Sequence, residues 1–218
     1  PEILWQFKRT IEGMSLVAEN FNAPVISGNV SFYNQASMNG KVEAVYPSPV
    51  IGMIGTIEKD KQMTLDFKRA DATIYLLGDL KDDISCSEYL YSYRGIKLSH
   101  TPYFDLDKES NMQKALSDLI NQGLIESAHD VSEGGIFISV LESAMCREFG
   151  FDLFTGGEIR LDSFLFGESQ GRVVVTVKEG KENDFIDMLN ISGVACCAIG
   201  SVRADGEITV DDEPFGKV

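Results

Sequence analysis

The residues best suited to chemistry lie at positions 128–135, which read Ala-His-Asp-Val-Ser-Glu-Gly-Gly. Downstream, Ile136, Val140 and Ala144 recur at helical spacing, so the pattern predicts a strand-to-helix junction here. Backbone N–H groups at the start of a helix favour phosphate, and the glycine pair lets a ligand approach the backbone. Asp130 adds a hard oxygen ligand suited to Mg²⁺. The junction is therefore a candidate cradle for phosphate and metal.

The same eight residues also fit a simpler structure, a plain helix capped by the side chain of Ser132 or Asp130. His129 either orients Asp130, contacts a ligand or makes a structural hydrogen bond. The residues alone leave these alternatives open.

A second candidate loop, Ser27 to Ser31, follows the short apolar run 24–27, where α/β sheets place ligands. Gly28 allows close approach of a phosphate, Asn29 offers a carbonyl oxygen to a hard cation, and Ser31 offers a hydroxyl to an anion. A tight turn held by the Asn and Ser side chains is the alternative.

A third candidate gathers a carboxylate, a hydroxyl and an amide, as Glu168, Ser169 and Gln170, before the predicted strand 172–177. These groups suit a polar ligand. A turn whose polar groups bond within the protein is the alternative.

Several other kinds of site find no support in the residue pattern. The chain lacks a GxxxxGK[ST] and a GxGxxG motif, which excludes the P-loop and Rossmann modes of nucleotide binding. Its two histidines form no HExxH or Ser/His/Asp pattern, and its four cysteines show no CxxC spacing. We therefore expect free thiols in a reducing compartment and no zinc site.

Charge and hydropathy limit the kinds of partner that the protein is expected to bind. The 218 residues carry a formal net charge of -15, which argues against non-specific binding of nucleic acid or of anionic membranes. The sequence has no apolar run of transmembrane length and no signal-peptide pattern, so we expect a soluble, cytoplasmic protein. Because the chain starts at Pro1 without Met, we also expect it to be a piece of a longer protein.

The elements that must position these loops follow from periodicity. Apolar residues at intervals of three and four predict an amphipathic helix over 2–21, and strand-like runs follow at 24–27, 42–46 and 50–57. A charged stretch then suggests a domain boundary near residue 63. Beyond it, strands are predicted at 72–77, 172–177, 195–202 and 207–210, and helices at 87–93, 107–121, 182–190 and from the junction to about 149. This alternation indicates an α/β or α+β fold in which helices cover a mixed sheet.

Taken together, four motifs resemble one family, phosphoribosylformylglycinamidine synthase, in the small, multi-subunit form of its synthetase subunit. They are the segments 24–34 (PVISGNVSFYN), 46–55 (YPSPVIGMIG), 128–135 (AHDVSEGG) and 166–170 (FGESQ). Members have two pseudo-symmetric halves, each an N-type domain followed by a C-type domain like those of aminoimidazole ribonucleotide synthetase. The resemblance implies that residues 1–62 end the second N-type domain and that residues 63–218 form the second C-type domain.

The resemblance also implies an activity. The family is an ATP-dependent ligase of purine biosynthesis that uses Mg²⁺ to convert formylglycinamide ribonucleotide and glutamine-derived ammonia into formylglycinamidine ribonucleotide. The amide oxygen is activated by phosphoryl transfer and then displaced by ammonia. The implied partners are a glutaminase subunit and a small bridging subunit.

Site roles are carried over by motif. Gly28 resembles the ATP-contacting glycine, Asn29 the Mg²⁺ ligand and Ser31 the substrate-contacting serine of the family. Asp130 and Ser132 resemble residues that bind Mg²⁺ and nucleotide at an auxiliary site in the long single-chain relatives. The triplet 168–170 echoes a substrate-binding triplet of the first half and is interpreted as its pseudo-repeat. The family's catalytic histidine belongs to the N-terminal half, so we expect this chain alone to be inactive.

Two other interpretations remain. One is another synthetase or kinase of the superfamily, such as aminoimidazole ribonucleotide synthetase, selenophosphate synthetase or thiamine-monophosphate kinase, although the motifs at 28–34 and 46–55 count against it. The other is a module without a catalytic role, which binds nucleotide structurally or docks partner subunits.

Overall fold

The computed structural model describes residues 2–29, 35–46 and 48–218. The chain divides into two compact units, Pro1–Thr56 and Ile57–Val218, referred to below as the first and second units. The assignment of residues 1–62 and 63–218 to an N-type and a C-type domain stays a prediction. None of the described helices is both long and apolar enough to cross a membrane.

In the first unit, the described residues form one helix and one hairpin. Helix α1 spans Glu2–Asn20, as its periodicity predicts, and strands β1 (Gln35–Met38) and β2 (Lys41–Ala44) pair antiparallel. The hairpin turn is Asn39-Gly40, where both residues have a positive φ and where this dipeptide favours a tight two-residue turn. No residue described in this unit is buried.

Two strands predicted in the first unit are wrong. Segments 24–27 and 50–57 lie outside any strand, and Ile26, Val50 and Ile54 are 89%, 97% and 94% exposed. A strand requires a neighbour with which to form a ladder of hydrogen bonds. Neither segment has a neighbouring strand within the described part of the unit. The apolar pattern therefore indicated residues that suit burial, but it could not indicate whether a partner strand was present.

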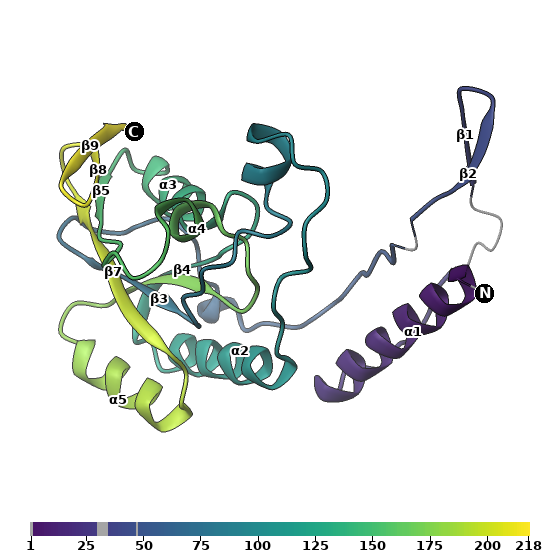
Figure 1. Ribbon diagram of the computed structural model, residues 1–218. Coiled ribbons are helices and arrows are strands. Elements are labelled where there is room, and N and C mark those ends of the chain that lie inside the picture. Colours follow the sequence, from purple (N-terminus) through teal and green to yellow (C-terminus); the bar gives the residue numbers. More distant parts are fainter. Residues whose placement is uncertain (1, 30–34, 47) are drawn as a thin grey trace. The chain divides into compact units, whose positions relative to one another are not determined.

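The second unit is built on a seven-stranded sheet (Figure 1). Its strand order is β4-β6-β3-β7-β5-β8-β9, and every pair is antiparallel except β5 and β8, which are parallel. The strands are β3 (Thr73–Leu77), β4 (Ile125–Asp130), β5 (Gly150–Leu153), β6 (Val173–Val177), β7 (Cys196–Arg203), β8 (Glu207–Val210) and β9 (Glu213–Lys217). The expected mixed sheet is thus confirmed.

Helices cover both faces of this sheet, with α2 and α5 on one side and α3 and α4 on the other (Figure 1). They span α2 (Leu106–Asn121), α3 (Gly135–Met145), α4 (Leu161–Phe166) and α5 (Glu182–Ser192). Alternate residues of β3 enter the two cores. Ile74 and Leu76 pack in the cluster with α3 and α4, whereas Leu77 packs in the cluster with α2 and α5. Every predicted strand of this unit is therefore matched, because alternation and helical spacing both encode burial.

Several short elements were not predicted, although the four-residue strand β8 was. Strands β5 and β9 and helix α4 have four to six residues each, too few to display a period. The predicted helix over 87–93 is a single π-helical turn, η2 (Tyr89–Tyr93), and a 3₁₀ turn, η1, spans Lys59–Lys61. Helix α3 ends at Met145, earlier than expected.

Candidate functional site

The predicted strand-to-helix junction exists. Strand β4 ends at Asp130 and helix α3 begins at Gly135, so a short loop joins them. The alternative of a side-chain cap is wrong, because the N-cap residue is Gly134, with φ 86°. The Ser132 hydroxyl instead donates to Oδ2 of Asp130 at 2.5 Å. The two candidate capping side chains therefore bond to each other.

The start of α3 is capped by a distant carboxylate. Oε1 of Glu168 accepts hydrogen bonds from the backbone N–H groups of Gly134 and Glu88, both at 2.8 Å. Other amides of the junction are also bonded within the protein, since Gly135 donates to the Ser132 carbonyl and Val131 to the Arg172 carbonyl. The backbone amides that the sequence offers to phosphate are thus partly taken by the chain itself.

Asp130 is the exposed carboxylate of the junction, with 77% of its side chain accessible. The hydrogen bond from Ser132 holds its pKa below the usual value, and His129 contributes in the same direction. His129 lies 3.5 Å from Asp130 through Nδ1 and 2.8 Å from Glu142 through Nε2. At neutral pH the junction therefore presents a charged, accessible oxygen ligand beside a hydroxyl.

The donor set at the junction suits a magnesium ion held mainly by a bound phosphate. Among the described residues there is no group of three His, Cys, Asp or Glu side chains placed to hold a metal. Magnesium commonly binds one or two carboxylates, keeps several waters and takes its other ligands from phosphate oxygens. Asp130 fits that mode as a lone protein ligand.

The turn that carries Glu168 is fixed by a buried arginine. Arg172 is 3% exposed and donates from its guanidinium to the Gly167 carbonyl at 2.7 Å and to the Ser169 carbonyl at 2.9 Å. Burial lowers the pKa of Arg172 to about 10, although the nearby carboxylates of Asp83 and Glu168 oppose this shift. The group remains charged at neutral pH and holds the turn in one conformation.

The members of the predicted triplet face different surroundings. Glu168 binds the two amides, Ser169 is 3% exposed with a hydroxyl that lacks a hydrogen-bond partner in the described chain, and Gln170 is exposed. Ser169 and Gln170 also line a pocket of about 120 Å³ beside α2. Two lysines line it, and Lys108 is paired with Asp79 at 2.6 Å.

The remaining predicted ligands belong to the first unit. Gly28 and Asn29 are exposed residues outside any helix or strand. Ser31 lies outside the described residues. The structure thus joins Asp130 and Ser132 to Glu168 through the junction backbone, and it describes Gly28 and Asn29 as part of a separate compact unit.

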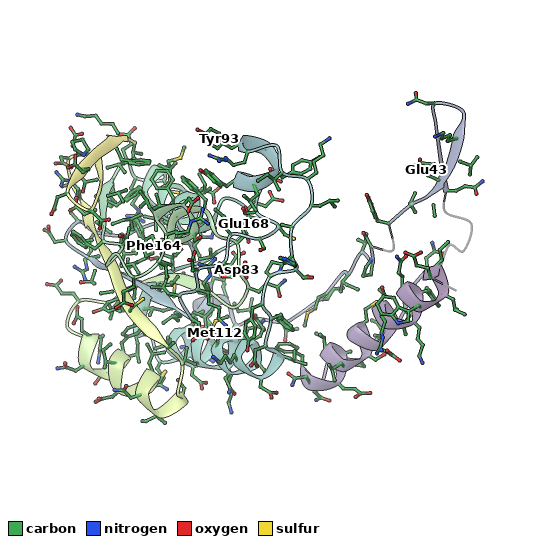
Figure 2. All side chains as sticks on the ribbon, in the orientation of Figure 1. Glu43, Asp83, Tyr93, Met112, Phe164 and Glu168 are labelled. Atoms are coloured by element: carbon green, nitrogen blue, oxygen red, sulfur yellow. The ribbon has the colours of Figure 1, made fainter. Side chains whose placement is uncertain are left out.

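Sequence reasoning missed the groups that hold this arrangement together. Asp83 accepts backbone hydrogen bonds from Ser85 and Tyr103 at 3.0 and 3.1 Å. In the view of Figure 2, Glu168 is drawn between Asp83 and Tyr93, the last residue of η2, and its contact with this region is the bond from the Glu88 amide. The one local signal was Arg172 itself, a charge at the start of an otherwise apolar strand, since buried charges are rare unless paired.

Comparison with protein families identifies the second unit. The family described as AIR synthase related protein, C-terminal domain, matches residues 69–213 of this chain. The chain belongs to this family. Related curated proteins are named phosphoribosylformylglycinamidine synthase subunit PurL. The one from Caldanaerobacter subterraneus is 39% identical over 96% of this chain and 28% of its own length, and the one from Methanobrevibacter smithii is 37% identical over 97% and 31%. The chain spans about three tenths of the length of these relatives.

Solved structures share the fold. Thermotoga maritima PurL complexed with FGAR has a TM-score of 0.63 at 17% identity, covering 73% of this chain and 29% of that one. The same protein complexed with ATP has a TM-score of 0.58 at 15% identity, covering 74% and 27%. At these identities the likeness concerns the architecture alone.

Proposed function

We propose that this chain is the C-terminal part of an ATP-dependent ligase that makes formylglycinamidine ribonucleotide from formylglycinamide ribonucleotide and ammonia drawn from glutamine. ATP transfers its γ-phosphoryl group to the amide oxygen, ammonia attacks the amide carbon, and phosphate leaves with that oxygen. The parent protein would be cytoplasmic and would work with a glutaminase subunit and a small bridging subunit.

One observation carries the proposal, namely 34–39% identity to curated PurL subunits over 92–97% of this chain. Thermotoga maritima PurL has been solved in complex with ATP and with FGAR, and the structure of PurLQS from the same organism is also known. Because this chain spans only part of such proteins, we assign the activity to the longer parent. By itself the chain would be inactive.

Within that reaction we assign the predicted ligands by residue. Gly28 lies against ATP, Asn29 gives its amide oxygen to Mg²⁺, and Ser31 contacts the substrate. Asp130 and Ser132 form an auxiliary site for a magnesium-bound nucleotide. The exposed, charged carboxylate of Asp130 and its bond to Ser132 support that role. When bound, Mg²⁺ supplies charge that offsets the phosphate oxygens.

A chimera tests the proposal. The matched 211 residues of the Caldanaerobacter subterraneus relative are replaced by this chain, and ADP formation is measured with formylglycinamide ribonucleotide and ammonium. We expect substrate-dependent turnover that falls in the Asn29→Ala chimera. The matched control is Asn20→Ala, a change of the same side chain at an exposed position at the end of α1. A folded chimera that consumes no ATP in the presence of substrate would overturn the assignment.

The non-catalytic alternative concerns the isolated chain and rests on how little of the relatives it spans. Calorimetry with Mg-ADP tests it. Binding in the submillimolar range that requires Mg²⁺ and is lost in Asp130→Ala would support a surviving nucleotide site. Absence of binding would favour a purely architectural role for this chain.

A further inference from the structure

The start of helix α3 is a place where an anion would be expected to bind, and the chain fills it itself. The first backbone N–H groups of a helix lack partners within the helix, and the helix dipole attracts negative charge to that end. At α3 the Gly134 amide points to Oε1 of Glu168 at 2.8 Å. This carboxylate stands where a phosphate oxygen would otherwise be bound.

The same oxygen also holds a second segment. Glu88, which precedes η2, donates its backbone N–H to Oε1 of Glu168 at 2.8 Å. The base of η2 is further anchored by Tyr89, whose ring stacks on Phe166 with centroids 5.1 Å apart. Beyond this base the chain projects apolar side chains into solvent, including Tyr93 and Leu98 at 75% and 88% exposure. Glu168 thus joins the junction loop to the root of an exposed aromatic segment.

Close packing leaves this carboxylate little freedom. A Cβ added to Gly135 would lie 2.6 Å from the Gly167 carbonyl oxygen, so the start of α3 approaches the backbone of the turn directly. The buried guanidinium of Arg172 holds the carbonyls on both sides of Glu168, those of Gly167 and Ser169. The carboxylate therefore projects from a turn that is fixed on both of its flanks.

We propose that Glu168 is a positioning residue, an internal anion that occupies the N-terminus of α3 and locks the Asp130–Ser132 loop to the base of η2. The inference rests on the proposed function for the identity of the ligand, a magnesium-bound nucleotide. It deepens that function, because it directs the phosphates to Asp130 and Ser132 and away from the Gly134 amide. Glu168 itself then contacts protein and not substrate.

Amide exchange measured by NMR on the 218-residue chain tests this role directly. In Glu168→Ala we expect exchange to accelerate about tenfold at Gly134 and Glu88 together, since each loses a bond to a charged acceptor. The amide of Val175, in the buried strand β6, serves as the reference and should be unchanged. The matched control is Glu133→Gln, which removes a charge at the same end of α3 from an exposed side chain.

The outcomes divide cleanly. Exchange at Gly134 and Glu88 that stays within about twofold in Glu168→Ala, or that rises equally in Glu133→Gln or at Val175, overturns the proposal. If Glu168→Ala does not fold, Glu168→Gln replaces it. Its amide oxygen keeps the shape but not the charge, and we expect a smaller acceleration confined to the same two amides.

Calorimetry with Mg-ADP on these variants keeps the two proposals apart. If wild-type protein binds no nucleotide while the two amides behave as expected, the auxiliary site fails and the role of Glu168 stands. The opposite result is nucleotide binding that requires Asp130, together with a change in the NMR chemical shift of the Gly134 amide of wild-type protein as large as direct contact with the nucleotide would cause. In that case the role of Glu168 fails and the auxiliary site stands.

Discussion

The first and second units differ in what holds their side chains in place. In the second unit both faces of a seven-stranded sheet are covered by helices, and large side chains such as Phe164 and Phe185 are at most 1% exposed. In the first unit no described residue is buried, and most apolar residues of α1 are open to solvent. Those residues include Ile3, Leu4, Trp5, Phe7, Ile11, Leu16 and Val17.

This difference bears on where the chemistry is positioned. The loops of the second unit are fixed by contacts within the unit, as Glu168 and Arg172 show. The ligands predicted in the first unit, Gly28 and Asn29, lie on a segment without a core of its own. We infer that packing beyond the described residues positions this segment, since the chain covers only 28% of the length of the Caldanaerobacter subterraneus relative.

The largest expected contrast comes from truncating one apolar side chain in each unit. Phe185→Ala removes a fully buried ring from the core between the sheet and α5. It should lower the free energy of unfolding by about 3–5 kcal/mol. Leu16→Ala, at 59% exposure in α1, should change it by less than about 0.5 kcal/mol. The free energy of unfolding of both variants is measured by urea denaturation monitored by far-UV circular dichroism. Equal losses would mean that the first unit has a core after all.

A second contrast separates a buried cation from an exposed one. Arg172→Ala breaks two bonds from the guanidinium to carbonyl groups and leaves a cavity in the second unit. We expect a loss of about 3 kcal/mol in the free energy of unfolding. The control, Arg94→Ala, removes an exposed side chain and should be neutral. A neutral Arg172→Ala would show that the turn 167–171 is held by other contacts.

Two glycines sharpen the account of the junction. Gly135 and Gly156 have the same φ of 69°, but a Cβ on Gly135 meets backbone atoms at 2.6–2.8 Å whereas one on Gly156 meets nothing within 4 Å. Substitution by Ala at Gly156 should cost only the strain of the left-handed conformation, about 1–2 kcal/mol. At Gly135 the cost should be greater by about 2 kcal/mol. Thermal unfolding of the two variants gives the difference, and equal costs would argue against close packing of α3 on the turn.

The smallest expected effect depends on pH. The hydrogen bond from Lys68 comes first in holding the pKa of Asp66 well below its usual range, and Thr64 and Arg147 act in the same direction. A lowered pKa contributes stability that is present above the unfolded-state pKa, about 3.9, and is lost as the pH falls toward the folded-state value. Asp66→Asn should therefore lower the free energy of unfolding by about 1 kcal/mol at pH 7. Below a pH of about 4 the difference in this free energy between the variant and the wild-type protein should be smaller.

The control for this pH effect lies in the first unit. Glu12→Gln removes the partner of two exposed ion pairs on α1, those with Lys8 and Arg9. Exposed pairs of this kind contribute little to stability. Urea unfolding at pH 7 and near pH 3.5 should therefore show no change for this variant, and a loss for Asp66→Asn that is the same at both pH values would contradict the linkage.

The helices and strands that could be predicted are those whose own residues carry a helical period or form an apolar run, as in β6. Predicted helix 107–121 is α2, and the alternation in β3 places Ile74 and Leu77 in opposite cores. The predicted strand over 50–57 failed because an apolar run indicates residues that suit burial and not the presence of a partner strand. The pattern of residues within a segment does not show which other segments lie beside it in the fold.

The junction illustrates the same limit at a candidate site. Its position between a strand and a helix followed from local spacing, and Asp130 was identified from its chemistry. Its cap did not follow, because Glu168 reaches Gly134 from the turn before β6. No local pattern reveals such a contact. The ligand assignments for Gly28, Asn29, Ser31 and the triplet 168–170 stay predictions.

Hydrogen exchange along the 218-residue chain tests the contrast between the units most directly. None of the residues of α1 is buried, and helices in proteins owe most of their stability to the packing of an amphipathic face. Strands in a buried sheet, in contrast, open only with the whole domain. At pH 7 we predict that the amides of β3 exchange about 10³-fold more slowly than those of α1, relative to their unfolded rates. Protection of α1 within about tenfold of β3 would contradict the claim that the first unit lacks a core of its own.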